Sequence, residues 1–198
     1  MYCLKSPCSY EETIKGSRFL SELFPCESQA AARDLVKAQK NKYPDATHVV
    51  HAFVIGPAAE ILGMSDDGEP SGTAGRPTLD VLKGGGCTNT LVTITRWFGG
   101  TLLGTGGLVK AYSGGVKGVL QAAQTAGLFE ELVEKRDFSF TCEYSLHKLI
   151  KLNMEQFVLY DVHEAFGEGV TISGKIRANQ FDSFAARLMD LTNGKICL

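Results

Sequence analysis

The chain has 198 residues and a net charge of −2, and 44% of its residues are apolar while 21% are charged. These values are typical of a globular protein with one large or two small domains, whose core needs neither disulfides nor a metal to hold it together. They exclude a general electrostatic attraction to nucleic acid, so any contact with RNA must come from a local patch.

The six cysteines are irregularly spaced and form no CxxC pair. No apolar stretch reaches the length of a membrane span, and no apolar run follows Lys5 as a secretion signal would require. We therefore expect a cytoplasmic protein with reduced thiols, most of them small core residues, and no association with a membrane.

The elements predicted in the first two thirds of the chain are a mixture of strands and helices. Residues 16–24 alternate apolar and polar side chains as a half-buried strand does, and Ser28 can cap a helix that runs to Tyr43. Further strands are predicted at 47–55, 61–64 and 89–98, with a loop at 65–77 and a helix at 78–83 that ends in three glycines. A second glycine cluster leads into a helix expected from about 108 to 126.

A charge run at residues 130–137 marks the junction between two predicted domains, at 1–130 and 135–198. The second domain is expected to contain strands at 138–144, 160–166, 170–176 and 195–198, and helices at 145–157 and 179–191. Their βαββαβ order is the ferredoxin-like pattern, so the sequence predicts an α+β fold.

Half of the glycines, 11 of 22, lie between residues 84 and 118. Glycine inside a helix or strand is unfavourable relative to alanine. This density therefore indicates that the backbone closely approaches another segment or a bound group. Helix-on-sheet packing is one explanation, and it suits the glycines within the helix. Anion binding by backbone N–H groups and the helix dipole is the other, and it suits the loop glycines Gly99, Gly100, Gly104, Gly106 and Gly107. The loop matches neither the Walker A nor the dinucleotide-binding pattern, and both explanations stay open for it.

Positive charge is concentrated in residues 71–120, which hold five basic residues and one acidic residue. The basic residues are Arg76, Lys83, Arg96, Lys110 and Lys117. Arg96 and Trp97 end a strand beside the glycine loop, where an arginine next to an aromatic ring suits phosphate binding and base stacking. The alternative is that Trp97 and Phe98 point into the core and that Arg96 is an ordinary surface charge.

Three carboxylates lie within four residues, at Asp66, Asp67 and Glu69. Together with a histidine they could bind a divalent metal or perform acid/base chemistry. His48 and His51 are three apart on a strand and point to opposite faces, so at most one of them can join the carboxylates. Asp and Gly also form turns for local reasons, and we expect a structural role for this loop, with no metal and no cofactor.

Three motifs resemble the signature of the IMPACT amino-terminal domain: DDGEPSGTAGRP at 66–77, RWFGG at 96–100 and LGTGGLVKAY at 103–112. The segments KGSRFL at 15–20 and DATH at 45–48 match earlier motifs of that family. Trp97 stands where tyrosine is usual, and Lys110 where arginine is common. With its small carboxy-terminal domain, the whole chain resembles the bacterial YigZ-like branch of the IMPACT family.

The resemblance implies a first domain with the ribosomal protein S5 domain 2-like fold and a second domain that is ferredoxin-like. This pair is similar to two consecutive carboxy-terminal domains of elongation factor G, which touch the ribosome. It also implies a role in translation, because eukaryotic relatives regulate translation by competing for the activator of a stress kinase.

The sequence thus predicts a translation-associated binding protein that contacts RNA, the ribosome or a translation-related protein. We expect a monomer or weak oligomer without DNA specificity. The expected contact residues are Arg76, Arg96, Trp97, Lys110 and the five loop glycines. Two alternatives stay open. One is a metal- or carboxylate-dependent hydrolase that uses Asp66, Asp67 and Glu69, and the other is a pure protein-interaction module.

Overall fold

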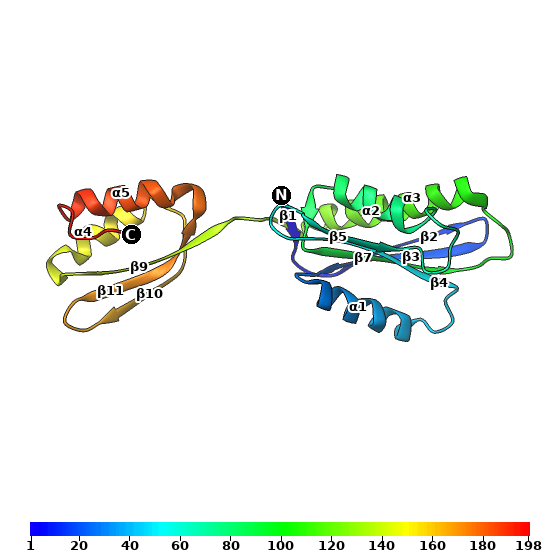
Figure 1. Cartoon of the computed structure of the whole chain (residues 1–198), viewed down its shortest axis with the longest axis horizontal. Helices are drawn as coiled ribbons and strands as arrows, with labels where there is room; N and C mark the ends of the chain where they lie inside the picture. The colour runs from blue at the N-terminus through cyan, green and yellow to red at the C-terminus, as the bar shows by residue number, and fades with distance from the viewer. The chain divides into compact units, whose positions relative to one another are not determined.

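The computed structural model describes residues 1–198 and divides into two compact units, Met1–Leu132 and Val133–Leu198. Each unit combines helices with a mainly antiparallel sheet, so the chain is an α+β protein with two domains (Figure 1). The division falls within the charge run at 130–137, where the sequence places the domain junction. None of the helices has the length and apolarity that a transmembrane segment needs.

The first unit is built on a five-stranded antiparallel sheet with the order β2-β3-β7-β4-β5. Its strands are β2 (Cys8–Ile14), β3 (Ser17–Pro25), β4 (His48–Ile55), β5 (Ile61–Ser65) and β7 (Thr90–Trp97). Helix α1 (Gln29–Lys42) covers one face, and helices α2 (Gly75–Gly84) and α3 (Gly104–Thr125) cover the other (Figure 1). A smaller sheet with the order β6-β1-β8 joins Cys87–Thr88, Tyr2–Leu4 and Phe129–Glu131.

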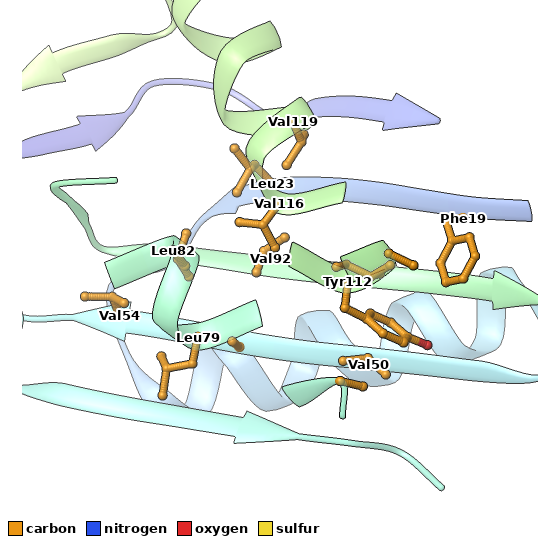
Figure 2. Close-up of a cluster of buried hydrophobic side chains, with 14 of the residues drawn as sticks. Phe19, Leu23, Val50, Val54, Leu79, Leu82, Val92, Tyr112, Val116 and Val119 are labelled. Carbon is orange, nitrogen blue, oxygen red and sulfur yellow. The ribbon is translucent and has the colours of Figure 1, made fainter. Parts of the chain in front are cut away.

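The main core of this unit lies between the central strands and the helix pair α2 and α3 (Figure 2). Leu23 and Val50 from the sheet are fully buried beneath Val116 of α3 and its neighbours. Burying a side chain of this size contributes about 1.5–3 kcal/mol. Tyr112 of α3 is also fully buried, and its ring stands edge-on to Phe19 of β3 with the ring centroids 5.5 Å apart. Its hydroxyl therefore needs a partner inside the protein.

Local signals placed α1 correctly, because the Ser28 hydroxyl accepts a hydrogen bond from the Ala31 N–H at 3.2 Å. The other two helices begin earlier than predicted, α2 at Gly75 instead of 78 and α3 at Gly104 instead of 108. Glycine is a poor helix former, so propensity puts both starts too late. At α2, hydrogen bonds from the Ala74 and Gly75 N–H groups to Asp66, which lies outside the helix, override this preference.

Strands β1 and β2 were not predicted, because β2 is a mixed polar edge strand whose burial merely alternates between partial and exposed. Its existence depends on pairing with β3, which aligns Cys8 with Leu23 and Ile14 with Ser17. Propensity alone does not specify such a strand, since a strand is stabilised by the neighbours it packs against.

The second unit has three strands in the order β10-β11-β9, namely β10 (Leu159–Phe166), β11 (Val170–Arg177) and β9 (Lys135–Cys142). Helices α4 (Tyr144–Met154) and α5 (Phe181–Leu191) pack on one face of this sheet, and a 3₁₀ turn (Ala178–Gln180) precedes α5. The core includes Phe138, Phe140, Ile150, Ile172 and Phe184.

The last strand predicted at 195–198 does not form. The N–H groups of Lys195 and Ile196 instead donate to the Thr192 carbonyl at 3.2 Å and the Thr192 hydroxyl at 3.1 Å. Ile196 is buried in the core of this unit. The chain end therefore stays at the end of α5, and the unit has the order βαββα with three strands, without the fourth strand of the predicted βαββαβ order.

Candidate functional site

A cavity of about 480 Å³ opens in the first unit where the end of β7, the start of α3 and the loop after β5 meet. We call it the β7–α3 cavity. It is lined by Thr47, His48, Gly68, Glu69, Pro70, Arg96, Phe98, Leu102, Leu103, Gly104, Thr105 and Leu108. Its volume lies within the range of small-ligand sites. Of the candidate residues from the sequence, the lining includes His48, Glu69, Arg96 and Gly104.

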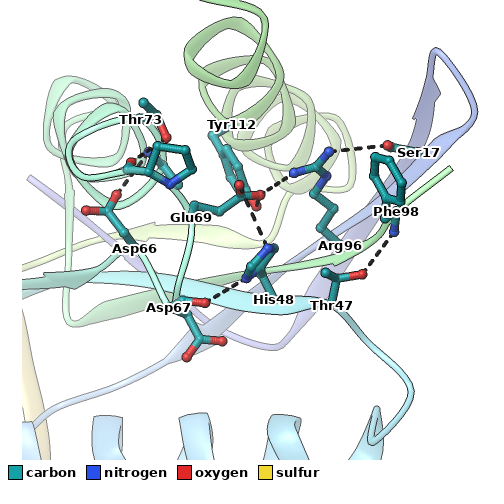
Figure 3. Close-up of polar contacts among 12 residues, drawn as sticks. Ser17, Thr47, His48, Asp66, Asp67, Glu69, Thr73, Arg96, Phe98 and Tyr112 are labelled. Atoms are coloured by element: carbon teal, nitrogen blue, oxygen red, sulfur yellow. Dashed lines mark hydrogen bonds and ion pairs between the residues drawn. The ribbon is translucent and has the colours of Figure 1, made fainter. Parts of the chain in front are cut away.

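A buried ion pair between Arg96 and Glu69 lines the cavity and forms its floor; Figure 3 shows the two side chains. Nη1 of Arg96 donates to Oε1 of Glu69 at 2.6 Å, and the Tyr112 hydroxyl donates to the same oxygen at 2.7 Å. The side chains of Arg96 and Glu69 are only 6% and 3% exposed. Burial, followed by the neighbouring Glu69 carboxylate, raises the pKa of Tyr112 far above its usual value. The phenol therefore stays protonated and can keep donating to Glu69.

His48 stands beside this pair with a defined tautomer. Its Nδ1 lies 2.8 Å from the backbone carbonyl oxygen of Asp67, and a carbonyl oxygen can only accept, so Nδ1 carries the proton. The other ring nitrogen, Nε2, lies 3.9 Å from Oε2 of Glu69 (Figure 3). His51 lies on the opposite side of the sheet, in a hollow formed with α1, as the strand alternation predicted.

Asp66 organises the loop in front of α2. Its carboxylate accepts hydrogen bonds from the N–H groups of Gly72 at 2.9 Å, Ala74 at 3.0 Å and Gly75 at 2.7 Å. It thereby caps α2, which has no capping side chain at its own N-cap residue. Burial alone would raise the pKa of Asp66, but these three bonds outweigh it and hold the pKa below its usual value.

The three carboxylates of the loop point in different directions and do not form one cluster. Asp67 accepts from the Val49 N–H at 2.7 Å and pairs with Lys40, while Asp66 faces its own loop and Glu69 faces Arg96. No group of three or more His, Cys, Asp or Glu side chains is placed to hold a metal ion. Of the three carboxylates that the hydrolase alternative requires, Glu69 alone lines the cavity.

The start of α3 presents bare backbone to the cavity. Its N-cap residue Leu103 makes no side-chain capping bond, and no acidic residue lies in the first turn. Gly104 and Gly106 are exposed, and a Cβ atom added to either would meet nothing within 4 Å. The positive end of a 22-residue helix is thus open to an anion.

The other three loop glycines differ in role. A Cβ atom at Gly99 would lie 1.8 Å from the carbonyl carbon of Gly16, so Gly99 is required for close packing of two backbone segments. Gly100 is exposed with a φ of +84°, a conformation that favours glycine. Gly107 is partly covered, and its added Cβ would lie 3.0 Å from that of Leu103.

The interpretation of Arg96 and Trp97 as exposed RNA contacts is corrected by their positions. Arg96 is buried and paired as described, so its guanidinium is not offered on the surface. Trp97 points to the opposite face, where its Nε1 donates to Asp45 at 3.0 Å and the Arg18 guanidinium lies 3.6 Å from its ring centroid. Both side chains are held by the protein itself.

The positive segment 71–120 is correspondingly less basic on the surface than its sequence indicates. Arg96 is neutralised by Glu69, and Arg76 pairs with Asp80 at 2.9 Å one helical turn away. Lys110 is exposed on α3, outside the cavity lining.

Sequence reasoning did not assign a role to Tyr112 or Leu102. A signal for Tyr112 was available, since it follows Leu108 by four residues on the apolar stripe of α3, where a buried phenol needs a partner. Leu102 is 82% exposed and Phe98 49% exposed, and both line the cavity. Exposure of two apolar side chains at one cavity could not be read from the sequence.

Comparison with known proteins agrees with the motifs. The family model described as Impact N-terminal domain matches residues 15–120, and a model described as a domain of unknown function matches residues 140–195. The chain is 34% identical to IMPACT family member YigZ of Escherichia coli over 98% of this chain and 94% of that relative. It is 33% identical to an IMPACT family member of Haemophilus influenzae over 98% of this chain and 93% of the relative.

Two solved structures were also similar. One, described as a crystal structure of a hypothetical protein, has a TM-score of 0.66 and 34% identity over 98% of this chain and 93% of the other. The two-domain translational regulator Yih1 has a TM-score of 0.36 and 21% identity over 61% of this chain and 46% of the other, too low to support an argument. On the family models and the full-length relatives, the chain belongs to the IMPACT family.

Proposed function

We propose that this protein acts in translation as an RNA-binding factor and that the β7–α3 cavity receives a phosphate group of the RNA. The observation that carries the proposal is the uncapped, glycine-rich start of α3 at the edge of a cavity with an exposed aromatic ring. Membership of the IMPACT family supports the translation context, because the resemblance to that family implies a role in translation.

The phosphate is expected at the first turn of α3. The N–H groups of Gly104, Thr105 and Gly106 have no partner within the helix, and the Thr105 hydroxyl is available as a further donor. The negative charge of Glu69 in the floor is offset by Arg96 at 2.6 Å, so it does not repel an anion at the helix start. In this arrangement the structural task of Arg96 is to neutralise the floor.

The apolar rim suits the nucleoside next to that phosphate. Phe98 is 49% exposed, and its backbone N–H is held by the Thr47 hydroxyl at 3.0 Å, which fixes the start of the loop (Figure 3). Stacking of a base on an aromatic ring contributes about 1–3 kcal/mol and tolerates any sequence. We therefore expect binding of single-stranded RNA without sequence preference.

The test is a titration of a short fluorescein-labelled single-stranded RNA, followed by fluorescence anisotropy at low and moderate salt. Gly106→Asp places a carboxylate in the first turn of α3, and Gly106→Asn places a neutral group of the same size there. Neither side chain meets a clash at its Cβ. An acidic residue at a helix start favours the helix, so loss of binding in the Asp variant does not arise from unfolding.

We expect Gly106→Asp to bind RNA about tenfold more weakly than Gly106→Asn, since like charges this close repel on the order of 1 kcal/mol or more. The difference should shrink as salt rises. Phe98→Ala should weaken binding without changing the salt dependence. Equal affinities of the two Gly106 variants would contradict the proposal, and co-sedimentation with ribosomes that resists salt and nuclease would favour a protein partner instead.

A further inference from the structure

A second and larger cavity, of about 670 Å³, lies in the first unit between the end of α2, the C-terminal half of α3 and the small sheet β6-β1-β8. We call it the α2–α3 cavity. It shares no lining residue with the β7–α3 cavity. Its volume is within the range of sites that bind small organic molecules. The proposed RNA contact makes no use of it.

The lining divides into an apolar part and a polar part. Val81, Cys87, Leu120 and Phe129 contribute apolar surface. Lys117, Gln121 and Gln124 follow one another at four and three residues along α3, and so share one face of the helix. This is the pattern of a site that holds an apolar body and orients it with a few polar groups.

The charge of the cavity has one sign. Lys117 is its one charged lining residue, and no acidic side chain lines it. Lys117 is exposed and takes part in no hydrogen bond or ion pair within the first unit. The Gln124 amide also lacks a side-chain partner, while Gln121 makes one long bond to Thr125 at 3.4 Å. The polar side is therefore complementary to an anionic group.

The three glycines that end α2 give an independent reason to regard the cavity as a site. Gly86 has a φ of +69°, and a Cβ atom at Gly85 would lie 3.0 Å from Leu120, so both have local reasons to be glycine. Gly84 has neither reason: its φ is not in the left-handed region, and an added Cβ would meet nothing within 4 Å. It is a helical residue that lines the cavity. Glycine is unfavourable there relative to alanine, and its evident effect is to keep the cavity open.

We propose that the α2–α3 cavity binds a small amphipathic carboxylate. Its apolar body lies against Leu120 and Phe129 beside the bare backbone of Gly84, and its carboxylate is held by Lys117 with the amides of Gln121 and Gln124. This site is separate from the proposed RNA contact, and its test does not depend on that function.

The probe is octanoate, compared with octylammonium and 1-octanol, which keep the chain and change the head group. Binding is followed by displacement of the fluorescent anion 1-anilinonaphthalene-8-sulfonate and by shifts of the Gln121 and Gln124 side-chain amide signals in NMR spectra. Three variants are compared. Lys117→Gln removes the charge, Gly84→Leu adds a side chain whose Cβ meets nothing within 4 Å and which extends into the cavity, and Lys110→Gln removes a matched exposed lysine of α3 outside the cavity.

We expect saturable octanoate binding that is weakened about fivefold by Lys117→Gln, the effect of one partly exposed ion pair, and is unchanged by Lys110→Gln. Gly84→Leu should abolish binding while its thermal unfolding midpoint stays at or above that of the parent. Octylammonium should bind more weakly than octanoate. Equal binding of octanoate and octylammonium, octanoate binding that survives Gly84→Leu, or no saturable octanoate binding would overturn the proposal.

Discussion

Replacing Arg96 with alanine should remove a large part of the stability of the first unit, because it leaves Glu69 buried without its partner. The two side chains are 6% and 3% exposed and lie 2.6 Å apart, so solvent cannot take over the role of the guanidinium. Tyr112 remains as a donor to Glu69 at 2.7 Å, but it carries no charge. Removing one partner of a buried ion pair lowers the free energy of unfolding by about 3–5 kcal/mol.

The size of the effect can be converted to a melting temperature. The first unit has 132 residues. With an unfolding entropy of about 2.1 cal/mol/K per residue, a loss of 3–5 kcal/mol lowers the midpoint by roughly 10–18 °C. Replacing both charges, as Arg96→Met with Glu69→Gln, should recover most of that loss, because a neutral pair has no buried charge to compensate.

Trp97 provides the assay. It is the single tryptophan of the chain and lies in the first unit, where it contacts Tyr43 and Arg18, so its fluorescence reports the unfolding of that unit alone. Urea titrations of the parent, both single variants and the double variant give a double-mutant cycle. A coupling energy of about 1–3 kcal/mol is expected.

A loss of less than about 1 kcal/mol in Arg96→Ala would refute this reasoning, since that is the value of an exposed ion pair. Arg96 would then be a surface group, and it would again be a candidate for binding phosphate. A large loss means that weakened RNA binding by Arg96→Ala reports unfolding, so the Gly106 pair is the better probe of the site.

Three further predictions concern Tyr112, His51 and Gly99 of the first unit. Tyr112→Phe should lower the free energy of unfolding of the first unit by about 1.5–3 kcal/mol at neutral pH. Because burial raises the pKa of Tyr112 above its unfolded value of 10.0, the native unit binds more protons in alkali and loses stability as the pH rises above about 10. In urea titrations between pH 8 and 11, the free energy of unfolding of Tyr112→Phe should therefore fall less with rising pH than that of the parent. Burial and then the charge of Lys40 lower the pKa of His51 below its unfolded value of 6.5, so the unfolded chain takes up the proton first and stability falls as the pH drops below about 6.5. His51→Leu should reduce this acid loss, and an unchanged difference in urea midpoint between pH 7 and pH 5 would count against it. Gly99→Ala should destabilise the first unit by about 1–3 kcal/mol or more, because its Cβ would lie 1.8 Å from Gly16. Gly106→Ala, whose Cβ meets nothing, should instead be neutral or stabilising by about 0.5–1 kcal/mol, and equal melting temperatures of the two variants would exclude the packing role of Gly99.

Elements with strong local signals were predictable from the sequence. The apolar runs of β4 and β7, the Ser28 cap of α1 and the hairpin of β10 and β11 all lie within a few residues of their predicted positions. The family motifs were equally local, and the resemblance that rests on them is confirmed by the family models.

Elements that depend on distant partners were misplaced or missed. The start of α2 is stabilised by Asp66, which lies outside the helix, and β2 exists because β3 pairs with it. The end of the chain reads as a strand by composition but binds to Thr192 at the end of α5. In each case a contact outside the segment outweighs its propensity.

The sequence by itself determined the fold class, the family and the fact that the glycine motifs gather around one helix start. Hydrophobic periodicity, capping residues and motif spacing are properties of neighbouring residues, so they can be recognised without knowledge of the fold. Only the tertiary structure decided the role of Arg96. Residues on adjacent positions of β7 point to opposite faces, and the partner that buries Arg96 is Glu69, 27 positions earlier in the chain. A charge is a surface group or a structural one according to what packs over it, and that depends on contacts between segments that are distant in sequence.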